Sequence, residues 1–296
     1  MSTSLADTPA AAPAAGPAGP LAGTVAGTFA AIPAAAPLAA APAAALAALA
    51  AGDPLALFLD FDGTLVDIAA TPDGVHVPAE LAGLLMQLEA ALGGALAFVT
   101  GRPIRELDGF LTPFRPVAAG VHGAEIRPGR GLGVARPAGA GIGGDVIDDG
   151  VLAAVRAFAA GHPALQVELK GAAIAVHYRA DPARESAVEA GLEAILASGP
   201  DHLVLCRGRK VFEIVPRAVS KGEALRALAA LPVFAGRRPV MIGDDVSDET
   251  ALAAARAMGG FGLQVAGEHF SAAAADFSGP AAVRGWLAAL IGEATR

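Results

Sequence analysis

The chain has 296 residues, which is enough for one large domain or for a core domain with a smaller one. Its net charge of −8 argues against nucleic acid as the main partner, because neutralising phosphates requires clustered Lys and Arg. The single cysteine, Cys206, excludes an internal disulfide and a cysteine-rich zinc site, and it fits a reducing compartment such as the cytoplasm.

The first fifty residues are rich in Ala and Pro, and no Lys or Arg occurs before Arg102. Secretory signals begin with positive charge and transit peptides carry arginines, so neither is expected. Prolines interrupt the Ala-rich stretch, which argues against a membrane span and a membrane partner. We expect a largely disordered tail over residues 1–52, with order beginning only after Pro42 in a short helix at 43–51.

An apolar run, Leu-Ala-Leu-Phe-Leu at 55–59, is typical of a buried parallel strand, and two carboxylates, Asp60 and Asp62, follow it. Buried unpaired carboxylates are costly, so a cation or a substrate should compensate them. At spacing i, i+2 both can project from the strand's carboxyl end, where open parallel sheets bind ligands, and Gly63 permits a sharp turn. The alternative is a polar loop start with an Asx-turn.

A helix and a second strand are predicted next. Five leucines fall on one helical face, namely Leu81, Leu84, Leu85, Leu88 and Leu92. A second apolar strand over 95–99 ends at Thr100-Gly101-Arg102, where a hydroxyl and backbone N–H groups can hold an anion. Strand-to-helix turns also contain Thr and Gly for conformational reasons alone.

The middle of the chain has a different pattern, which predicts a small α+β domain at 127–216 inserted between core segments at 53–126 and 217–296. Its expected elements are a helix over 145–160, strands at 166–170 and 173–179, a helix from 181, and strands at 203–207 and 210–215. The Gly-rich stretch at 129–144 matches no phosphate-binding fingerprint, and we expect a flexible surface segment there.

Ser220-Lys221-Gly222-Glu223 matches a capping box at a helix start, with Ser220 as the N-cap and Glu223 at N3. Lys221 then lies in the first turn, where the backbone N–H groups and the helix dipole favour anions. A cation is locally unfavourable there, which suggests a bound anion. A solvated lysine is the alternative.

A third apolar strand, at 239–242, ends in four carboxylates within six residues, starting at Asp244. Mg²⁺ prefers oxygen ligands and commonly takes one or two carboxylates plus substrate phosphate. Ser247, Asp248 and Glu249 can instead cap a helix start, an interpretation we accept for Glu249 and partly for Asp248. Strands separated by helices predict a parallel sheet with all these groups along one edge. The set suits phosphoryl transfer, in which one carboxylate attacks phosphorus, another moves the proton and cations offset charge.

The sequence resembles the haloacid dehalogenase superfamily of phosphohydrolases and, more closely, the trehalose-6-phosphate phosphatases, over about residues 55–290. The resembling stretches are Asp60–Leu65, Thr100–Arg102, Ala119–Glu125, Glu168–Gly171, Val176–Arg179, Phe212–Pro216, Ser220–Ala224 and Gly243–Glu249. The resemblance implies an α/β fold, with a Rossmann-like parallel-sheet core and a small inserted α+β cap domain. Where that family commonly has Lys, this chain has Arg209 followed by Lys210, and either can make the sugar contact.

The resemblance also implies roles for individual residues. Asp60 would be the nucleophile, Asp62 the acid and then the base, and Thr100 and Lys221 would hold the phosphoryl oxygens. Mg²⁺ is implied as the cofactor, with Asp60, Asp62 (through its backbone carbonyl), Asp244 and Asp248 as candidate ligands. The residues expected to contact the substrate are Gly101, Arg102, His122, Gly123, Glu125, Lys170, Arg179, Arg209 and Glu213.

The implied activity is hydrolysis of the small molecule trehalose 6-phosphate. One alternative is a phosphatase of the same superfamily acting on another sugar phosphate, such as sucrose phosphate or mannosyl-phosphoglycerate. Another is a non-catalytic sugar-phosphate-binding regulator, against which the presence of both Asp60 and Asp62 argues.

Overall fold

The computed structural model describes residues 39–69, 74–130, 132–135, 147–171 and 173–295. Its helices are α1 (Ala40–Ala50), α2 (Leu81–Ala91), α3 (Ile104–Leu111), α4 (Asp149–Ala160), α5 (Glu185–Ala197), α6 (Lys221–Ala229), α7 (Glu249–Ala257) and α8 (Pro280–Ala294), with 3₁₀ turns η2 (Val121–Gly123), η3 (Pro182–Arg184) and η4 (Val246–Asp248). Its strands are β1 (Leu55–Leu59), β2 (Leu96–Val99), β3 (Val117–Gly120), β4 (Glu125–Arg127), β5 (Gln166–Leu169), β6 (Ile174–His177), β7 (Leu203–Gly208), β8 (Val211–Pro216), β9 (Arg238–Gly243) and β10 (Phe261–Gln264).

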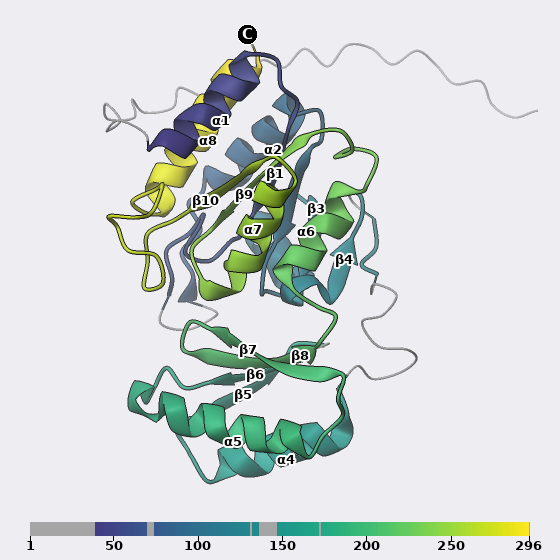
Figure 1. Cartoon of the computed structure of the whole chain (residues 1–296), viewed down its shortest axis with the longest axis vertical. Helices are drawn as coiled ribbons and strands as arrows, with labels where there is room; N and C mark the ends of the chain where they lie inside the picture. Colours follow the sequence, from purple (N-terminus) through teal and green to yellow (C-terminus); the bar gives the residue numbers. More distant parts are fainter. Residues whose placement is uncertain (1–38, 70–73, 131, 136–146, 172, 296) are drawn as a thin grey trace, which may run out of the picture. The chain divides into compact units, whose positions relative to one another are not determined.

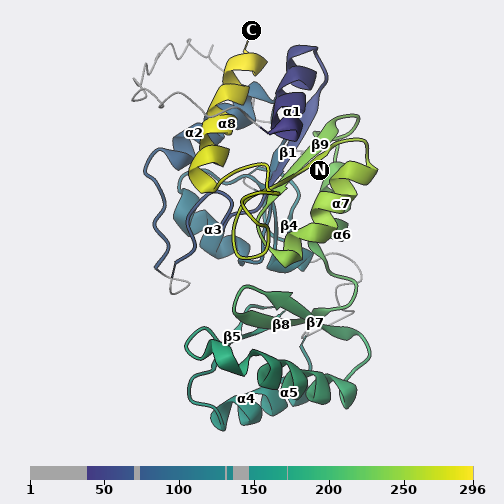
Figure 2. The same cartoon turned by 60° about the vertical axis from the view of Figure 1, so that its left-hand side comes forward.

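The core sheet has the strand order β10-β9-β1-β2-β3-β4, and every neighbouring pair is parallel except β3 with β4 (Figure 1). Strand β1 is wholly buried, and its last residue, Leu59, pairs with Phe98 of β2 and Ile242 of β9. These three strands therefore end at one level, which brings the segments after them to a single edge of the sheet. Helices α6 and α7 pack together on one side of this sheet, and α2 and α8 pack together on the other (Figure 2).

The inserted part has its own sheet, β5-β6-β8-β7, in which all neighbours are antiparallel. Helices α4 and α5 pack against this sheet and share with it an apolar cluster that includes Val155, Val176, Leu192, Phe212 and Ile214. Successive side chains on a strand point to opposite faces. Since Phe212 and Ile214 of β8 enter that cluster, Glu213 between them points to the face without helices. The predicted α/β fold with an inserted α+β cap is confirmed.

The predicted first residue of the cap, Arg127, is the last residue of a core strand. Arg127 belongs to β4 of the core sheet, where it is buried, pairs with Asp108 (Nη1–Oδ1 2.7 Å) and donates from Nε to the Pro116 carbonyl. The cap helix α4 begins at Asp149 with Asp148 as its N-cap. Residues 131 and 136–144 of the expected glycine-rich segment lie outside the described part.

The chain is ordered earlier than expected. Helix α1 begins at Ala40 and packs against α8, and both Pro42 and Ala45 are buried. The buried indole N–H of Trp286 donates to the Pro42 carbonyl at 3.1 Å, so Pro42 is part of the packed structure. The rest of the expected tail, residues 1–38, lies outside the described residues. Among the described helices, none combines the length and apolar character that crossing a membrane requires.

Candidate active site

A buried lysine and two buried carboxylates form the floor of the site. Lys221 Nζ lies 3.1 Å from Asp60 Oδ1 and 2.7 Å from Asp248 Oδ1. Lys221 occupies the first turn of α6, and the Glu223 N–H donates to the Ser220 hydroxyl at 3.1 Å, which confirms Ser220 as the N-cap. The anions that compensate Lys221 in this structure are therefore carboxylates of the protein.

A third carboxylate, Asp244 at the end of β9, completes an acidic cluster. One oxygen each from Asp60, Asp244 and Asp248 lies within 4.8 Å of the others, and all three residues are buried. Burial, followed by the charge of Asp248, raises the pKa of Asp60 to about 7. Burial and the charge of Asp60 raise the pKa of Asp244 to about 9. One lysine thus does not balance three carboxylates, and this set of oxygen donors fits a hard divalent cation.

The turn after β1 brings the backbone very close to this cluster. Gly63 has φ +76°, and a Cβ there would lie 2.0 Å from Asp244 Oδ2. The Thr64 hydroxyl donates to Asp244 Oδ1 at 3.2 Å. Glycine is therefore required at position 63 by both its backbone conformation and the space that the Asp244 carboxylate occupies.

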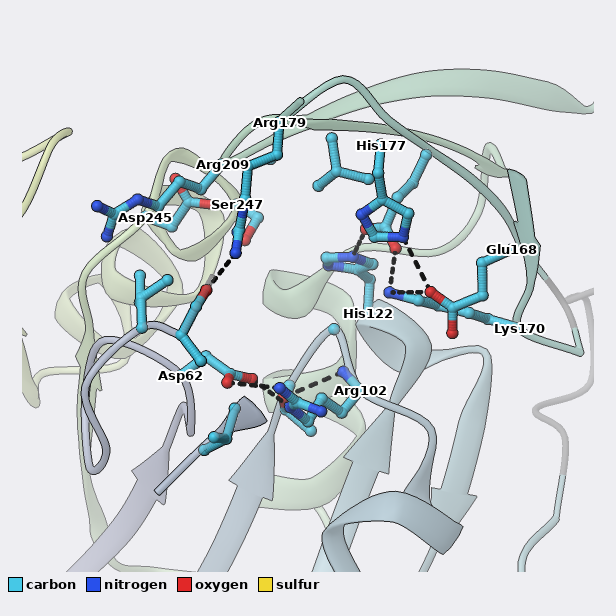
Figure 3. Close-up of a pocket in the computed structure, with 18 of the residues that line it drawn as sticks. Asp62, Arg102, His122, Glu168, Lys170, His177, Arg179, Arg209, Asp245 and Ser247 are labelled. Atoms are coloured by element: carbon cyan, nitrogen blue, oxygen red, sulfur yellow. Dashed lines mark hydrogen bonds and ion pairs between the residues drawn. The ribbon is translucent and has the colours of Figure 1, made fainter. Parts of the chain in front are cut away.

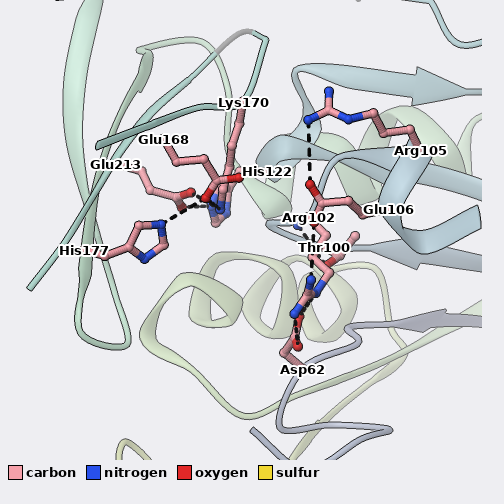
Figure 4. A network of polar contacts seen from close by, with 10 residues as sticks. All are labelled: Asp62, Thr100, Arg102, Arg105, Glu106, His122, Glu168, Lys170, His177 and Glu213. Carbon is pink, nitrogen blue, oxygen red and sulfur yellow. Dashed lines mark hydrogen bonds and ion pairs between the residues drawn. The ribbon is translucent and has the colours of Figure 1, made fainter. Parts of the chain in front are cut away.

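The second carboxylate of the motif, Asp62, pairs with Arg102 (Figures 3 and 4). Arg102 Nε lies 2.5 Å from Asp62 Oδ2, and Arg102 Nη2 lies 2.8 Å from Asp62 Oδ1. The buried Thr100, at the end of β2, accepts a hydrogen bond from the Arg102 backbone N–H at 3.2 Å. Arg102 was expected to contact substrate, and in this structure its guanidinium pairs with the predicted proton donor.

The cap contributes a second polar cluster, around Glu213 (Figure 4). Lys170 Nζ donates to Glu213 Oε1 at 2.9 Å, and His122 Nε2 contacts Glu213 Oε2. Burial alone would raise the pKa of Glu213, but Lys170 and His122 outweigh it and hold that pKa well below its usual range. Beside this cluster, His177 Nε2 lies 2.9 Å from Glu168 Oε2.

His122 is presented by an unusual backbone turn. His122 has φ +57° and the preceding Val121 has φ +48°, a left-handed conformation that a β-branched residue rarely adopts. The His122 N–H donates to the Thr100 carbonyl at 3.0 Å, which ties this turn to the end of β2. Such local strain is a common feature of functional sites, where the surrounding structure enforces it.

These groups line one cavity of about 480 Å³, which is within the usual size of a small-molecule site. The predicted residues that line it are Asp60, Asp62, Thr100, Gly101, Arg102, His122, Lys170, Arg179, Arg209, Glu213, Lys221 and Asp244. Figure 3 labels Asp62, Arg102, His122, Lys170, Arg179 and Arg209 among them. Two of them are already engaged: Arg179 donates to the Ala69 carbonyl, and Arg209 Nη2 lies 2.9 Å from Glu268 Oε1.

Three predicted residues do not line the cavity. Glu125 accepts a hydrogen bond from the Ile104 N–H at 2.9 Å and thereby serves the start of α3. Gly123 has φ +113°, and a Cβ there would lie 2.9 Å from the Ala224 Cβ, so it permits close packing against α6. Asp248 is fully buried behind Lys221. In this structure Glu125 and Gly123 support the wall of the cavity.

Six polar residues that line the cavity were not predicted as site residues from the sequence, namely Glu106, Gln166, Glu168, His177, Asp245 and Ser247. For the cap residues a signal was present. Gln166, Glu168 and Lys170 alternate along one strand, so that recognising Lys170 as a candidate also predicts the other two on the same face.

The fold and the site define a class of protein. A strand-end aspartate beside a helix-start lysine and an acidic cluster, at the carboxyl edge of a parallel sheet with an inserted cap, is the arrangement of haloacid dehalogenase-type phosphohydrolases. A haloacid dehalogenase-like hydrolase from Bacteroides thetaiotaomicron has this fold, with a TM-score of 0.51 at 17% identity over 75% of this chain and 92% of that one. The C-terminal domain of C. albicans trehalose-6-phosphate phosphatase is more similar in structure, with a TM-score of 0.73 at 20% identity over 88% of this chain and 99% of that one.

Sequence comparison identifies the family within this class. The trehalose-phosphatase family model matches residues 58–278. A probable trehalose-phosphate phosphatase of Sinorhizobium fredii is 41% identical over 241 residues, covering 80% of this chain and 88% of the relative. The trehalose-6-phosphate phosphatase of Escherichia coli is 38% identical over 212 residues, covering 71% and 77%. The chain belongs to the trehalose-phosphatase family.

Proposed function

We propose that this protein is a magnesium-dependent phosphatase that hydrolyses trehalose 6-phosphate to trehalose and phosphate. The observation that carries the proposal is the composition of the cavity described above. It combines a carboxylate next to a lysine, Asp60 and Lys221, with a set of charged hydrogen-bonding groups from the cap. The first part suits a phosphoryl group and the second suits the hydroxyl groups of a sugar, because buried polar groups must find hydrogen-bond partners.

The proposed reaction uses Asp60 as the nucleophile and Asp62 as the acid and then the base. Asp60 attacks phosphorus while Asp62 gives a proton to the leaving sugar oxygen, which breaks the sugar-phosphate bond and forms an aspartyl-phosphate. Asp62 then takes a proton from water as the water attacks phosphorus, and the bond to Asp60 breaks. Lys221, 3.1 Å from Asp60, and the Thr100 hydroxyl stabilise the phosphoryl oxygens.

Asp60, Asp244 and Asp248 are the residues that would hold Mg²⁺, because their oxygens lie close enough together to share one ion. When bound, the ion would offset negative charge on the carboxylates and the phosphoryl oxygens. Without it, the raised pKa of Asp60 would keep much of this carboxylate protonated at neutral pH and unable to act as a nucleophile.

The cap residues would select the sugar. Lys170, His177, Glu168 and Glu213 present donors and acceptors from the face of the cap sheet that carries no helices, and His122 joins them from the core. A compact aryl phosphate needs none of these contacts. Selectivity for a disaccharide phosphate over small phosphomonoesters is therefore expected to depend on this cluster.

The test is phosphate release from trehalose 6-phosphate, sucrose 6-phosphate, glucose 6-phosphate and p-nitrophenyl phosphate, each with Mg²⁺ or with EDTA. We expect the highest kcat/KM for trehalose 6-phosphate, and activity only with the metal. A clear preference for another sugar phosphate would overturn the substrate assignment. The absence of release from every substrate would favour a non-catalytic binding protein.

A further inference from the structure

Arg102 binds both oxygens of the Asp62 carboxylate. Its Nε and Nη2 bind the two oxygens of Asp62 at 2.5 and 2.8 Å, in the parallel two-bond geometry that only arginine provides. Its Nη1 lies 3.3 Å from Glu106, in the first turn of α3. The side chain of Arg102 is 11% exposed, whereas that of Asp62 is 29% exposed, so the arginine is the more firmly enclosed partner.

A stack of side chains fixes the guanidinium group relative to the Asp60-Phe61-Asp62 backbone. The Arg102 guanidinium carbon lies 4.9 Å from the centre of the Phe110 ring. That ring stacks on Phe61, with centroids 5.6 Å apart and planes 20° apart. Phe61 is fully buried and lies between the two catalytic aspartates in sequence. Phe61 therefore contacts Phe110, Phe110 contacts Arg102, and Arg102 binds Asp62, the residue that follows Phe61 in the chain.

We propose that Arg102 is a positioning residue that holds Asp62 in reach of the leaving-group oxygen, and that it is not primarily a phosphate-binding or sugar-binding residue. This inference rests on the proposed function. A short carboxylate side chain on a turn can adopt several rotamers, and only some of them reach the substrate. The two-bond pair and the aromatic stack restrict Asp62 to one rotamer, facing the cavity. Both oxygens pair with Arg102 while Asp62 is ionised; when one oxygen takes up the proton that the leaving group needs, that oxygen turns to the substrate and the other stays bound to Arg102. Such restriction matters for a proton donor because transfer requires hydrogen-bond contact with the reacting oxygen.

The test compares two leaving groups. The alkoxide of trehalose needs a proton to leave, whereas p-nitrophenolate leaves without one. The constant compared is kcat/KM, because it reports the steps up to formation of the aspartyl-phosphate. Arg102→Ala should lower kcat/KM for trehalose 6-phosphate by about 10- to 100-fold, mainly through kcat, and for p-nitrophenyl phosphate by only about threefold. Arg102→Lys should fall between, and added guanidinium ion should partly restore Arg102→Ala.

The matched control is Arg105→Ala, at the second residue of α3. The Arg105 side chain is 66% exposed and lies 3.7 Å from Glu106. It should behave as wild type on both substrates. An equal loss on both substrates with Arg102→Ala, or a loss confined to KM, would overturn the inference and assign Arg102 to phosphate or substrate binding. If Arg102→Ala does not fold, the losses of kcat/KM on the two substrates are compared for Arg102→Lys, and the same two outcomes support or overturn the inference. Wild-type protein that releases phosphate from neither substrate would instead refute the proposed function.

Discussion

Metal binding should reverse a pH-dependent loss of stability. In the metal-free protein, burial and Asp248 raise the pKa of Asp60 from 3.8 to about 7, and burial and Asp60 raise that of Asp244 from 3.8 to about 9. Between about pH 4 and these values the folded protein keeps protons that the unfolded chain has released. The free energy of unfolding therefore falls as pH rises through this window, by about 4 kcal/mol for Asp60 alone. A divalent cation bound by ionised carboxylates removes that loss.

Calorimetric melting at pH 5 and pH 8, with EDTA or with Mg²⁺, measures this effect. The metal-free Tm should be lower at pH 8 than at pH 5, and Mg²⁺ should raise Tm more at pH 8, because protons compete with the cation at pH 5. Asp244→Asn should weaken both effects. Glu249→Gln is the control, because Glu249 is exposed and pairs with His269 at 2.8 Å. A metal-free Tm that is flat or rises towards pH 8, or an equal Mg²⁺ shift at both pH values, would refute the reasoning.

Three further outcomes are expected. Glu213→Ala should lower kcat/KM for trehalose 6-phosphate by about 10- to 100-fold, because each hydrogen-bond donor left unpaired costs about 1–3 kcal/mol. The loss of kcat/KM for p-nitrophenyl phosphate should be much smaller. Equal losses on both substrates would assign Glu213 to the fold or to closure of the cap. Gly63→Ala should abolish the Mg²⁺-induced rise in Tm, because the added methyl group would collide with Asp244. Gly236→Ala is the control: Gly236 has a similar φ of +75° but open space around it, so this substitution should only lower stability. A normal Mg²⁺-induced rise in Tm for Gly63→Ala would contradict the prediction. Trp286→Phe should lower Tm by about 2–4 °C through loss of its hydrogen bond to α1, and an unchanged Tm would show that this contact adds no stability.

The sequence was sufficient to predict those elements whose signals lie within a few consecutive residues. The strand at 55–59 was predicted to the residue, because five apolar side chains in a row end at a carboxylate and a glycine turn. The start of α6 was predicted because Ser220 and Glu223 form a local motif that needs no distant partner. The leucine face of α2 followed from helical periodicity, and Leu81, Leu84, Leu85 and Leu88 are all buried.

Distant partners account for most of what was missed. Strands β3, β4 and β10 have three or four residues each, with Ala and Gly prominent in β3 and Gly in β10, so neither length nor β-propensity marks them. The role of Glu125 depends on the Ile104 N–H, 21 residues away. The partner of Asp62 is Arg102, 40 residues away. Such contacts are set by the sheet order, which residue spacing alone does not encode.

The most direct test of the account is whether phosphate passes through Asp60. Wild-type protein and Asp60→Asn would be mixed with trehalose 6-phosphate and Mg²⁺, quenched in acid and digested, and the peptides examined by mass spectrometry alongside measurement of phosphate release. The account predicts a phosphorylated peptide containing Asp60 in the wild type, and loss of both the modification and phosphate release in Asp60→Asn, with melting showing that the variant is folded. Phosphate release by Asp60→Asn within a few-fold of wild type, or phosphorylation at another residue, would contradict it.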